Sequence, residues 1–281
     1  MSKYALSIII PTDRYSPYLA KILRYLKYVC NYYDIEIIII STTDNPANRL
    51  YEKICKNFSS CIYYTIEREK RKDTRARQMN LGVFLSHSDY VYIIGDDLLP
   101  TCKLLRNLLE VLRYRGVDAI LHAMIPRPIS LWSKIRMIEK IFSSFNIQKS
   151  SCRIIRRDIF IKLGGYRDDL VLGEDIDFQN RLVAIKPNII AILPDKGFEI
   201  HLGEYKTLSA YIRRAYYYGK HMKTLAQYIG VRRMLHAYVA TPIAIRDMPK
   251  YFRLYILALI LYEVVIALAT IVGRLFGKKY E

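Results

Sequence analysis

The run ALSIII, residues 5–10, is apolar at every position but Ser7 and ends at a Pro-Thr-Asp turn. A short continuous apolar run of this kind is typical of a strand that is buried on both faces of a sheet. Comparable strands are predicted at 35–40 (IEIIII), 61–67 (CIYYTIE), 90–94 (YVYII) and 118–125 (DAILHAMI). Helix-period segments separate them at 18–32, 44–56, 74–86 and 103–114. This alternation predicts an α/β fold with a mostly parallel, doubly wound sheet, whose ligands bind at the carboxyl ends of the strands.

The chain is strongly basic, with 44 Lys and Arg against 26 Asp and Glu and a net charge of +18 over 281 residues. Such an excess favours polyanions as partners, namely nucleic acid, anionic lipid or phosphorylated small molecules. The five cysteines are scattered and form no CxxC pair, so we expect neither a zinc site nor a disulfide framework, and a reducing compartment. The apolar run at the N-terminus is too short for a signal peptide.

The position of the first glycine excludes two kinds of nucleotide site. A P-loop or a GxGxxG turn needs glycines directly after the first strand, so that the backbone can approach the phosphates. The first glycine of this chain is Gly82. If the fold binds a nucleotide, a metal or side chains must therefore neutralise its charge.

One acid pair follows a predicted strand directly. In YVYIIGDDLLP, residues 90–100, the strand ends at Gly95, and Asp96 and Asp97 come next. Adjacent carboxylates at a strand end can hold a hard divalent cation that keeps open positions for phosphate oxygens. The alternative is a polar turn with no ligand.

A second acid cluster lies in GEDIDFQNRL, residues 173–182. Glu174 and Asp175 are placed in the first turn of a predicted helix, where acids favour the positive end of the helix dipole. Asp177 and Arg181 are spaced for an i,i+4 pair. The acids of this cluster therefore either stabilise the start of a helix or include a catalytic carboxylate.

The order and spacing of several motifs resemble glycosyltransferase family 2, a large family of inverting enzymes with the GT-A (Rossmann-like) fold. The resemblance covers roughly residues 5–220. The matched pieces are SIIIPT, STTDN, ARQMNLG, IIGDDLLP, GGYRDDLVLGEDIDFQNRL and EIHLGEYKTLSAYIRRAYYYGK. The chain departs from the family at Gly95, where the first Asp of a DxD motif is usual, and at Ser41, where the second strand usually ends in Asp.

The resemblance implies that the acidic strand end holds Mn²⁺ or Mg²⁺ on the diphosphate of a UDP- or GDP-linked sugar. By position, Asp97 is implied as the metal ligand. His201 of EIHLG falls where some members have a third metal ligand, and a structural histidine is the alternative. The metal would neutralise the charge that builds on the departing nucleotide.

The same resemblance implies Asp175 as the general base that takes the proton of the acceptor hydroxyl, so that one displacement inverts the anomeric carbon. Glu174 and Asp177 are expected beside the acceptor and sugar, where like-charge repulsion would raise the pKa of Asp175.

Donor contacts are expected from the carboxyl ends of the strands and from the helix before the acid pair. These residues are Pro11, Thr12, Asp44, Asp96 and Arg77, with Arg75 also able to assist. For the two arginines, a solvated helix face is the alternative.

The C-terminal third differs in composition from the rest. We expect a catalytic domain at 1–204, a basic, tyrosine-rich amphipathic segment at 205–250, and a hydrophobic helix with a basic tail at 251–281. The run 254–272 carries a single charge, Glu263, and is long enough to span a bilayer, so it is predicted to associate with the membrane. A buried helix, a homodimer helix and an interfacial helix are alternatives.

These inferences predict a membrane-associated glycosyltransferase whose catalytic domain is cytoplasmic, with a lipid-phosphate or glycan acceptor. The alternative function is a non-catalytic protein that binds nucleic acid or anionic lipid on the same fold. No nucleic-acid motif is found, and nucleic acid is not expected as a partner. A sugar-nucleotide pyrophosphorylase would need a glycine-rich loop after the first strand, which PTDRYSPY (11–18) does not supply.

Overall fold

The computed structural model describes residues 4–30, 33–69, 73–113, 116–143, 152–170, 172–229 and 256–276. The chain forms two compact units. One, here called the sheet unit, comprises Met1–Ala123 and Ser151–Gly203. The other, here called the helical unit, comprises Met124–Ser150 and Glu204–Glu281.

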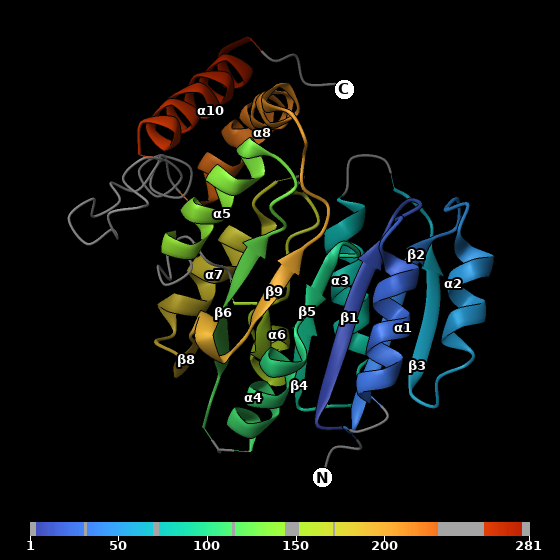
Figure 1. Ribbon diagram of the computed structural model, residues 1–281. Helices are drawn as coiled ribbons and strands as arrows, with labels where there is room; N and C mark the ends of the chain where they lie inside the picture. The colour runs from blue at the N-terminus through green and yellow to red at the C-terminus, as the bar shows by residue number, and fades with distance from the viewer. Residues whose placement is uncertain are drawn as a thin grey trace. The chain divides into compact units, whose positions relative to one another are not determined.

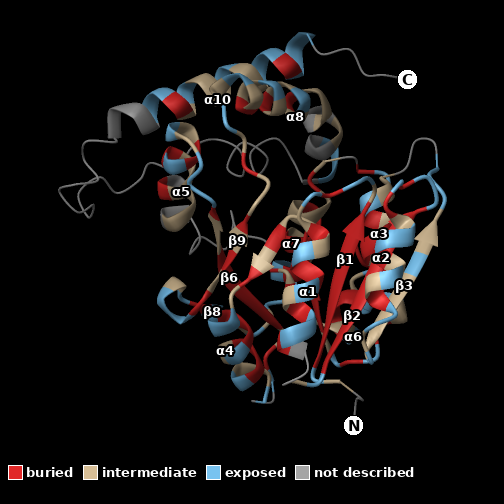
Figure 2. Cartoon of the chain, turned by 45° about the vertical axis from the view of Figure 1, so that its right-hand side comes forward, coloured by how far each residue is buried: buried red, intermediate tan, exposed pale blue. Residues whose placement is uncertain are grey.

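The predicted parallel strands are present and lie in the order β3-β2-β1-β4 (Figure 1). Their bounds are β1 Leu6–Thr12, β2 Ile35–Thr42, β3 Cys61–Ile66 and β4 Tyr90–Ile93. Every residue of β1 and β2 is buried (Figure 2), as expected for central strands covered on both faces. The carboxyl ends of β1, β2 and β4 therefore share one edge of the sheet.

The rest of the sheet is mixed, which corrects the mostly parallel prediction. The fifth predicted strand is β6 (Ala119–Pro126), and the others are β5 (Leu98–Pro100), β7 (Ile154–Arg156), β8 (Ile189–Ile192) and β9 (Phe198–His201). β8 pairs with β6 in parallel, but β7 pairs antiparallel with β4 and β6, and β5 with β9. β9 thereby returns to the acid pair that follows β4.

Seven helical segments of the described chain belong to the sheet unit. They are α1 Leu19–Cys30, α2 Asn48–Cys55, α3 Thr74–Leu85, α4 Cys102–Leu112, α6 Arg157–Lys162, α7 Glu174–Ala184 and the 3₁₀ turn η1 Pro194–Lys196. α3 begins at Asp73, whose carboxylate accepts hydrogen bonds from the backbone of Arg75 and Ala76. It packs closely on β1, because a Cβ at Gly82 would lie 2.3 Å from Ile9 Cγ2.

One buried side chain fixes α3 to the carboxyl ends of two strands. The Gln78 amide nitrogen donates to the carbonyl oxygens of Thr12 at 2.9 Å and Ile40 at 3.0 Å. Gln78 has no exposed surface, so the two bonds are shielded from water. This anchor sets where the first turn of α3 lies relative to the ends of β1 and β2.

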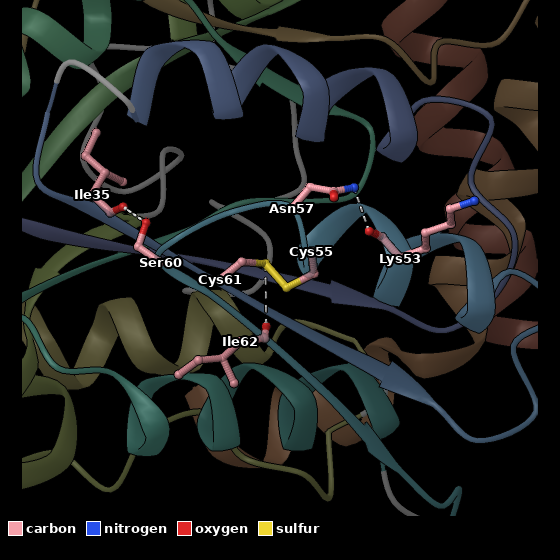
Figure 3. The surroundings of a disulfide bond; sticks show 7 residues. All are labelled: Ile35, Lys53, Cys55, Asn57, Ser60, Cys61 and Ile62. Carbon is pink, nitrogen blue, oxygen red and sulfur yellow. Dashed lines mark hydrogen bonds between the residues drawn. A yellow bond between two sulfur atoms is a disulfide. The ribbon is translucent and has the colours of Figure 1, made fainter.

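A disulfide joins Cys55, the last residue of α2, to Cys61, the first residue of β3 (Figure 3). The prediction that the cysteines form no disulfide is therefore wrong. The intervening loop is further held by Asn57, which donates to Lys53 O, and by Ser60, which donates to Ile35 O. The spacing of six residues matches no standard motif, and only the turn from α2 into β3 brings the two sulfurs together.

We expect the double variant Cys55→Ser/Cys61→Ser to lose about 2 kcal/mol of unfolding free energy, because the crosslink restricts a short loop of the unfolded chain. Urea denaturation of the wild type and the variant, each with and without reductant, measures this. Reductant should lower the stability of the wild type to that of the variant. Equal stability of all four samples would contradict the expectation.

The helical unit contains α5 (Leu131–Ser143), α8 (Leu208–Ile229) and α10 (Ile256–Phe276). Its core is formed by Ile135, Ile138, Tyr211 and Tyr262. α8 and α10 approach each other through glycines: a Cβ at Gly219 would lie 2.1 Å from Thr270 O, and one at Gly273 2.1 Å from Tyr216 O. The two backbones are therefore in direct contact.

The predicted membrane-spanning helix is not supported. Across the described ranges, every helix falls short of the length and apolar character that crossing a bilayer requires. α10 occupies part of the predicted run, and one face of it packs against α8 and the core. Residues 230–250 of the tyrosine-rich segment and the tail 277–281 lie outside the described residues.

Candidate active site

The acid pair after β4 lies against the end of β1. The Thr12 hydroxyl donates to Asp96 Oδ2 at 2.9 Å, and the Ser16 hydroxyl donates to the Asp96 carbonyl at 2.9 Å. Burial raises the pKa of Asp96 above its ordinary value; the Thr12 bond opposes this rise and the Asp97 carboxylate adds to it. Pro11 precedes Thr12 in buried β1, so the structure brings three predicted donor residues to one place.

Asp97 faces His201, the last residue of β9. Their Oδ2 and Nε2 atoms are 3.2 Å apart, and the backbone N–H of Leu202 donates to the Asp97 carbonyl at 2.8 Å. Burial alone would raise the pKa of Asp97, but the His201 hydrogen bond and the Arg75 cation outweigh it and lower the pKa. Asp97 is therefore a carboxylate at neutral pH. The two predicted metal ligands lie together, 104 positions apart in sequence, because β5 and β9 pair.

Gly95 makes room for these groups. A Cβ at Gly95 would lie 2.9 Å from Asp97 Oδ1 and 3.3 Å from Arg75 Nη2. The departure from the DxD pattern therefore coincides with a place where a carboxylate and a guanidinium already converge.

Arg75, rather than Arg77, lies at the site. Arg77 instead binds Glu69 at 2.5 Å and the Glu67 carbonyl at 3.1 Å. The Arg75 cation contributes to the lowered pKa of Asp97 and opposes the rise in the pKa of Glu174. The sequence predicts Arg77 among the donor contacts and gives Arg75 only an assisting role, because the rotation of α3 cannot be read from the sequence.

The second acid cluster is held against α3 by a glycine turn. Gly164 and Gly165 have φ of +80° and +66°, a conformation that favours glycine. Tyr166, the residue after this turn, makes two hydrogen bonds with Asn80 of α3. The Asn80 amide nitrogen donates to Tyr166 O at 2.7 Å, and the Asn80 amide oxygen accepts from Tyr166 N at 2.9 Å. Gly173, with φ +83°, then leads into α7. The start of α7 is thereby positioned beside the start of α3.

Glu174 and Asp175 form the first turn of α7, as predicted. Burial, followed by the neighbouring Asp175 carboxylate, raises the pKa of Glu174 to about 8, while Arg75 opposes the rise. Like-charge repulsion was expected to act on Asp175, but the pKa that is raised is that of Glu174. Asp175 Oδ1 accepts from the backbone N–H of Ile176 at 2.9 Å.

Asp177, predicted beside the acceptor and sugar, is in an ion pair within α7. Its carboxylate is buried and pairs with Arg181 at 2.7 Å, the structural alternative that the i,i+4 spacing allowed. Arg181 also donates to the carbonyls of Leu163 and Gly165. The pair therefore ties α7 to the glycine turn.

A buried charged residue, Glu199, precedes His201 on β9 by two positions. Glu199 of β9 accepts from the Tyr92 hydroxyl at 2.6 Å and lies 3.3 Å from His122 and 3.6 Å from Arg153. Burial would raise the pKa of Glu199, but His122, Arg153 and Tyr92 outweigh it and lower the pKa. Arg153 also interacts electrostatically with Asp175 of α7. Sequence patterns missed this group, because its members come from four separate strands or strand ends.

Asp44 is exposed and lies with a second carboxylate around one arginine. Arg68 contacts Asp44 at 2.8 Å and Asp13 at 3.4 Å, and donates to the Asp13 carbonyl. These residues follow the ends of β1, β2 and β3. Ser41, which stands where the family has Asp, donates to Asn48 at 2.7 Å.

Two side chains, Asp97 and His201, lie together at the predicted metal position. Among the residues with described positions, no group of three or more His, Cys, Asp or Glu is arranged to hold a metal ion. Asp97 and His201 are two donors.

Comparison with solved structures identifies the fold. The mannosyltransferase PcManGT from Pyrobaculum calidifontis, in complex with GDP-Man and Mn²⁺, matches with a TM-score of 0.66 and 14% identity over 99% of this chain and 88% of that one. TarS 1-349 from S. aureus, in complex with UDP-GlcNAc, matches with a TM-score of 0.55 and 11% identity over 96% and 89%. No curated protein matches the chain in sequence.

A family model matches the first part of the chain, which includes the acid pair after β4. The model of glycosyl transferase family 2 matches residues 7–167, more than half of the chain, from β1 through the glycine turn. Together with the fold, this match establishes that the chain belongs to glycosyltransferase family 2, has the GT-A fold and is a glycosyltransferase enzyme.

Proposed function

We propose that the enzyme transfers a sugar from a UDP- or GDP-linked donor to an acceptor hydroxyl with inversion at the anomeric carbon. The observation that carries this proposal is the convergence of Arg75 and Asp97 at Gly95, where the Arg75 charge also acts on Glu174. A donor diphosphate and an acceptor hydroxyl must meet at one point. We assign the Asp96/Asp97 pair to the donor and the Glu174/Asp175 pair to the acceptor. PcManGT and TarS were solved with GDP-Man and UDP-GlcNAc, which supports this donor class.

The residues at Asp97 fit a divalent cation. A carboxylate of lowered pKa stands 3.2 Å from an imidazole nitrogen, and Mg²⁺ or Mn²⁺ commonly takes one or two protein ligands and completes its shell with water and substrate phosphates. Asp97 and His201 would hold the ion, which would act as a Lewis acid on the diphosphate. Arg75 would add a second positive charge beside the leaving group.

Asp175 is the proposed general base. Its carboxylate is at the start of α7, and its neighbour Glu174, with a pKa of about 8, holds the proton of the pair at neutral pH. Glu174 can then donate a hydrogen bond to the sugar or acceptor, while Asp175 accepts the proton of the attacking hydroxyl. A single base on one side of the sugar gives inversion.

The ends of β1 and β2 are the proposed nucleoside side of the site. Asp44 and Asp13 offer carboxylates on either side of Arg68, and the backbone of Pro11 and Thr12 lies at the next strand end. Carboxylates there can accept hydrogen bonds from a ribose or a base.

The donor half of the proposal is tested by thermal protection. UDP- or GDP-sugars with Mn²⁺ should raise the Tm of the wild type by binding the folded state. In Asp97→Ala the same donor should bind about 100-fold more weakly, because the contact through the metal is lost. Asp195→Ala, which changes an exposed aspartate of the sheet unit, is the matched control and should keep full protection. Undiminished, metal-dependent protection of Asp97→Ala would refute the assigned metal ligand.

A further inference from the structure

The positive charge of the protein is concentrated in the helical unit. Its 105 residues carry eighteen Lys and Arg but only five Asp and Glu, a net charge of +13 out of +18. The sheet unit is larger and holds the remaining +5. A charge density of this kind attracts anionic surfaces.

The helical unit also exposes a long apolar surface. Eight large apolar side chains of α10 are between 44% and 73% exposed: Ile260, Leu261, Val264, Leu268, Ile271, Val272, Leu275 and Phe276. Each lies three or four residues from another member of the set, so they form one stripe of the helix, here called the outer stripe. Figure 2 shows exposed and intermediate colouring along α10. Tyr262 and Gly273 lie on the side packed against α8 and the core.

A groove between α8 and α10 extends this surface. Its volume is 590 Å³, and its lining is Ile212, Arg213, Tyr216, Val265, Leu268, Ala269 and Val272. Arg213 is the charged member of this otherwise apolar or aromatic set. An apolar groove beside a cation matches the two parts of an anionic lipid, namely an acyl chain and a negative headgroup.

We propose that the outer stripe docks on a bilayer that contains anionic lipids, with α10 lying in the interface. A helix with an exposed apolar stripe and flanking cations binds membranes in this way. A second copy of the chain is disfavoured as the occupant, because each helical unit carries +13. Nucleic acid would meet the charge but leave the apolar stripe without a partner.

Vesicle co-sedimentation tests the proposal without a donor or acceptor, so its result is separate from that of the proposed transfer reaction. The full chain should sediment with vesicles of phosphatidylcholine containing phosphatidylglycerol, and much less with phosphatidylcholine alone. Added salt should weaken the binding, because the headgroup attraction is screened. The absence of binding to the anionic vesicles would overturn the proposal.

Two matched pairs of variants identify the surface. Phe276 and Phe84 are 73% and 72% exposed, in the helical and the sheet unit respectively. Phe276→Ser should reduce vesicle affinity about tenfold, and Phe84→Ser should not change it. Arg213→Gln should weaken binding about fivefold, whereas Arg113→Gln, an exposed arginine of the sheet unit, should have little effect.

Two other outcomes would show that the outer stripe does not dock on a membrane. If Phe276→Ser binds vesicles as tightly as the wild type at an unchanged Tm, the outer stripe is not the docking surface. If size-exclusion chromatography shows a wild-type dimer that Phe276→Ser dissociates, the stripe is an interface between copies, and the proposal is equally overturned.

Discussion

The variant Asp175→Asn is expected to lower kcat about 10³-fold and to leave donor affinity within about twofold of the wild type. The amide keeps the size and position of the carboxylate at the start of α7 but cannot take a proton from the acceptor hydroxyl. General-base catalysis contributes about 10² to 10⁴ in rate, so its loss dominates the effect. Transfer is measured by steady-state kinetics, and donor binding by calorimetry with the same nucleotide sugar.

Asp177→Asn on the same helix is the matched control. Asp177 pairs with Arg181, so its loss should cost about 1–3 kcal/mol of unfolding free energy and leave the kcat of the folded enzyme close to normal. The assignment of the base fails if Asp175→Asn still transfers sugar at near the wild-type rate. It also fails if both variants lose kcat equally, because the effect would then be structural.

The second large effect concerns pH and Glu174. Its pKa is about 8 in the folded protein against an ordinary value of 4.5, so between these values the folded state holds a proton that the unfolded state releases. Stability must then fall as pH rises from about 4.5 through 8, by up to about 5 kcal/mol from this group. Above pH 8 both states are ionised and the contribution is flat.

Glu174→Gln removes this titration. The variant should lose less stability than the wild type between pH 5 and pH 9, and at about pH 9 it should be the more stable of the two. Glu110→Gln, at an exposed site on α4, should follow the wild-type profile. Urea denaturation at a series of pH values measures the three curves. Parallel curves for Glu174→Gln and the wild type would show that the pKa of Glu174 is not raised in the folded protein.

The central strands and one end of the site could be predicted from the sequence. Runs such as ALSIII and IEIIII are apolar at every position but one, which is typical of a strand covered on both faces. The place of Asp96 and Asp97 then followed from where a strand stops. The start of α7 was predictable for a similar reason, because Gly173 and the acids after it are typical of a helix beginning.

Other features depend on tertiary contacts that no local pattern records. β5 and β7 have three residues each, too few to show a period, and their antiparallel pairing was missed with them. The choice of Arg75 over Arg77 depends on the rotation of α3, which the Gln78 and Gly82 contacts fix. The run around α10 is apolar enough to suggest a membrane span, but its pattern does not distinguish a helix face that packs on α8 from one that is exposed.

The backbone contact between Gly219 and Gly273 restricts how this protein can diverge. A single methyl group at either position would meet a carbonyl oxygen at 2.1 Å, so the smallest possible gain in side-chain size is blocked on both helices. Relatives that keep this crossing should retain glycine at both sites. Lineages that lose one glycine would have to re-space the helix pair, and the two positions are therefore expected to change together during evolution.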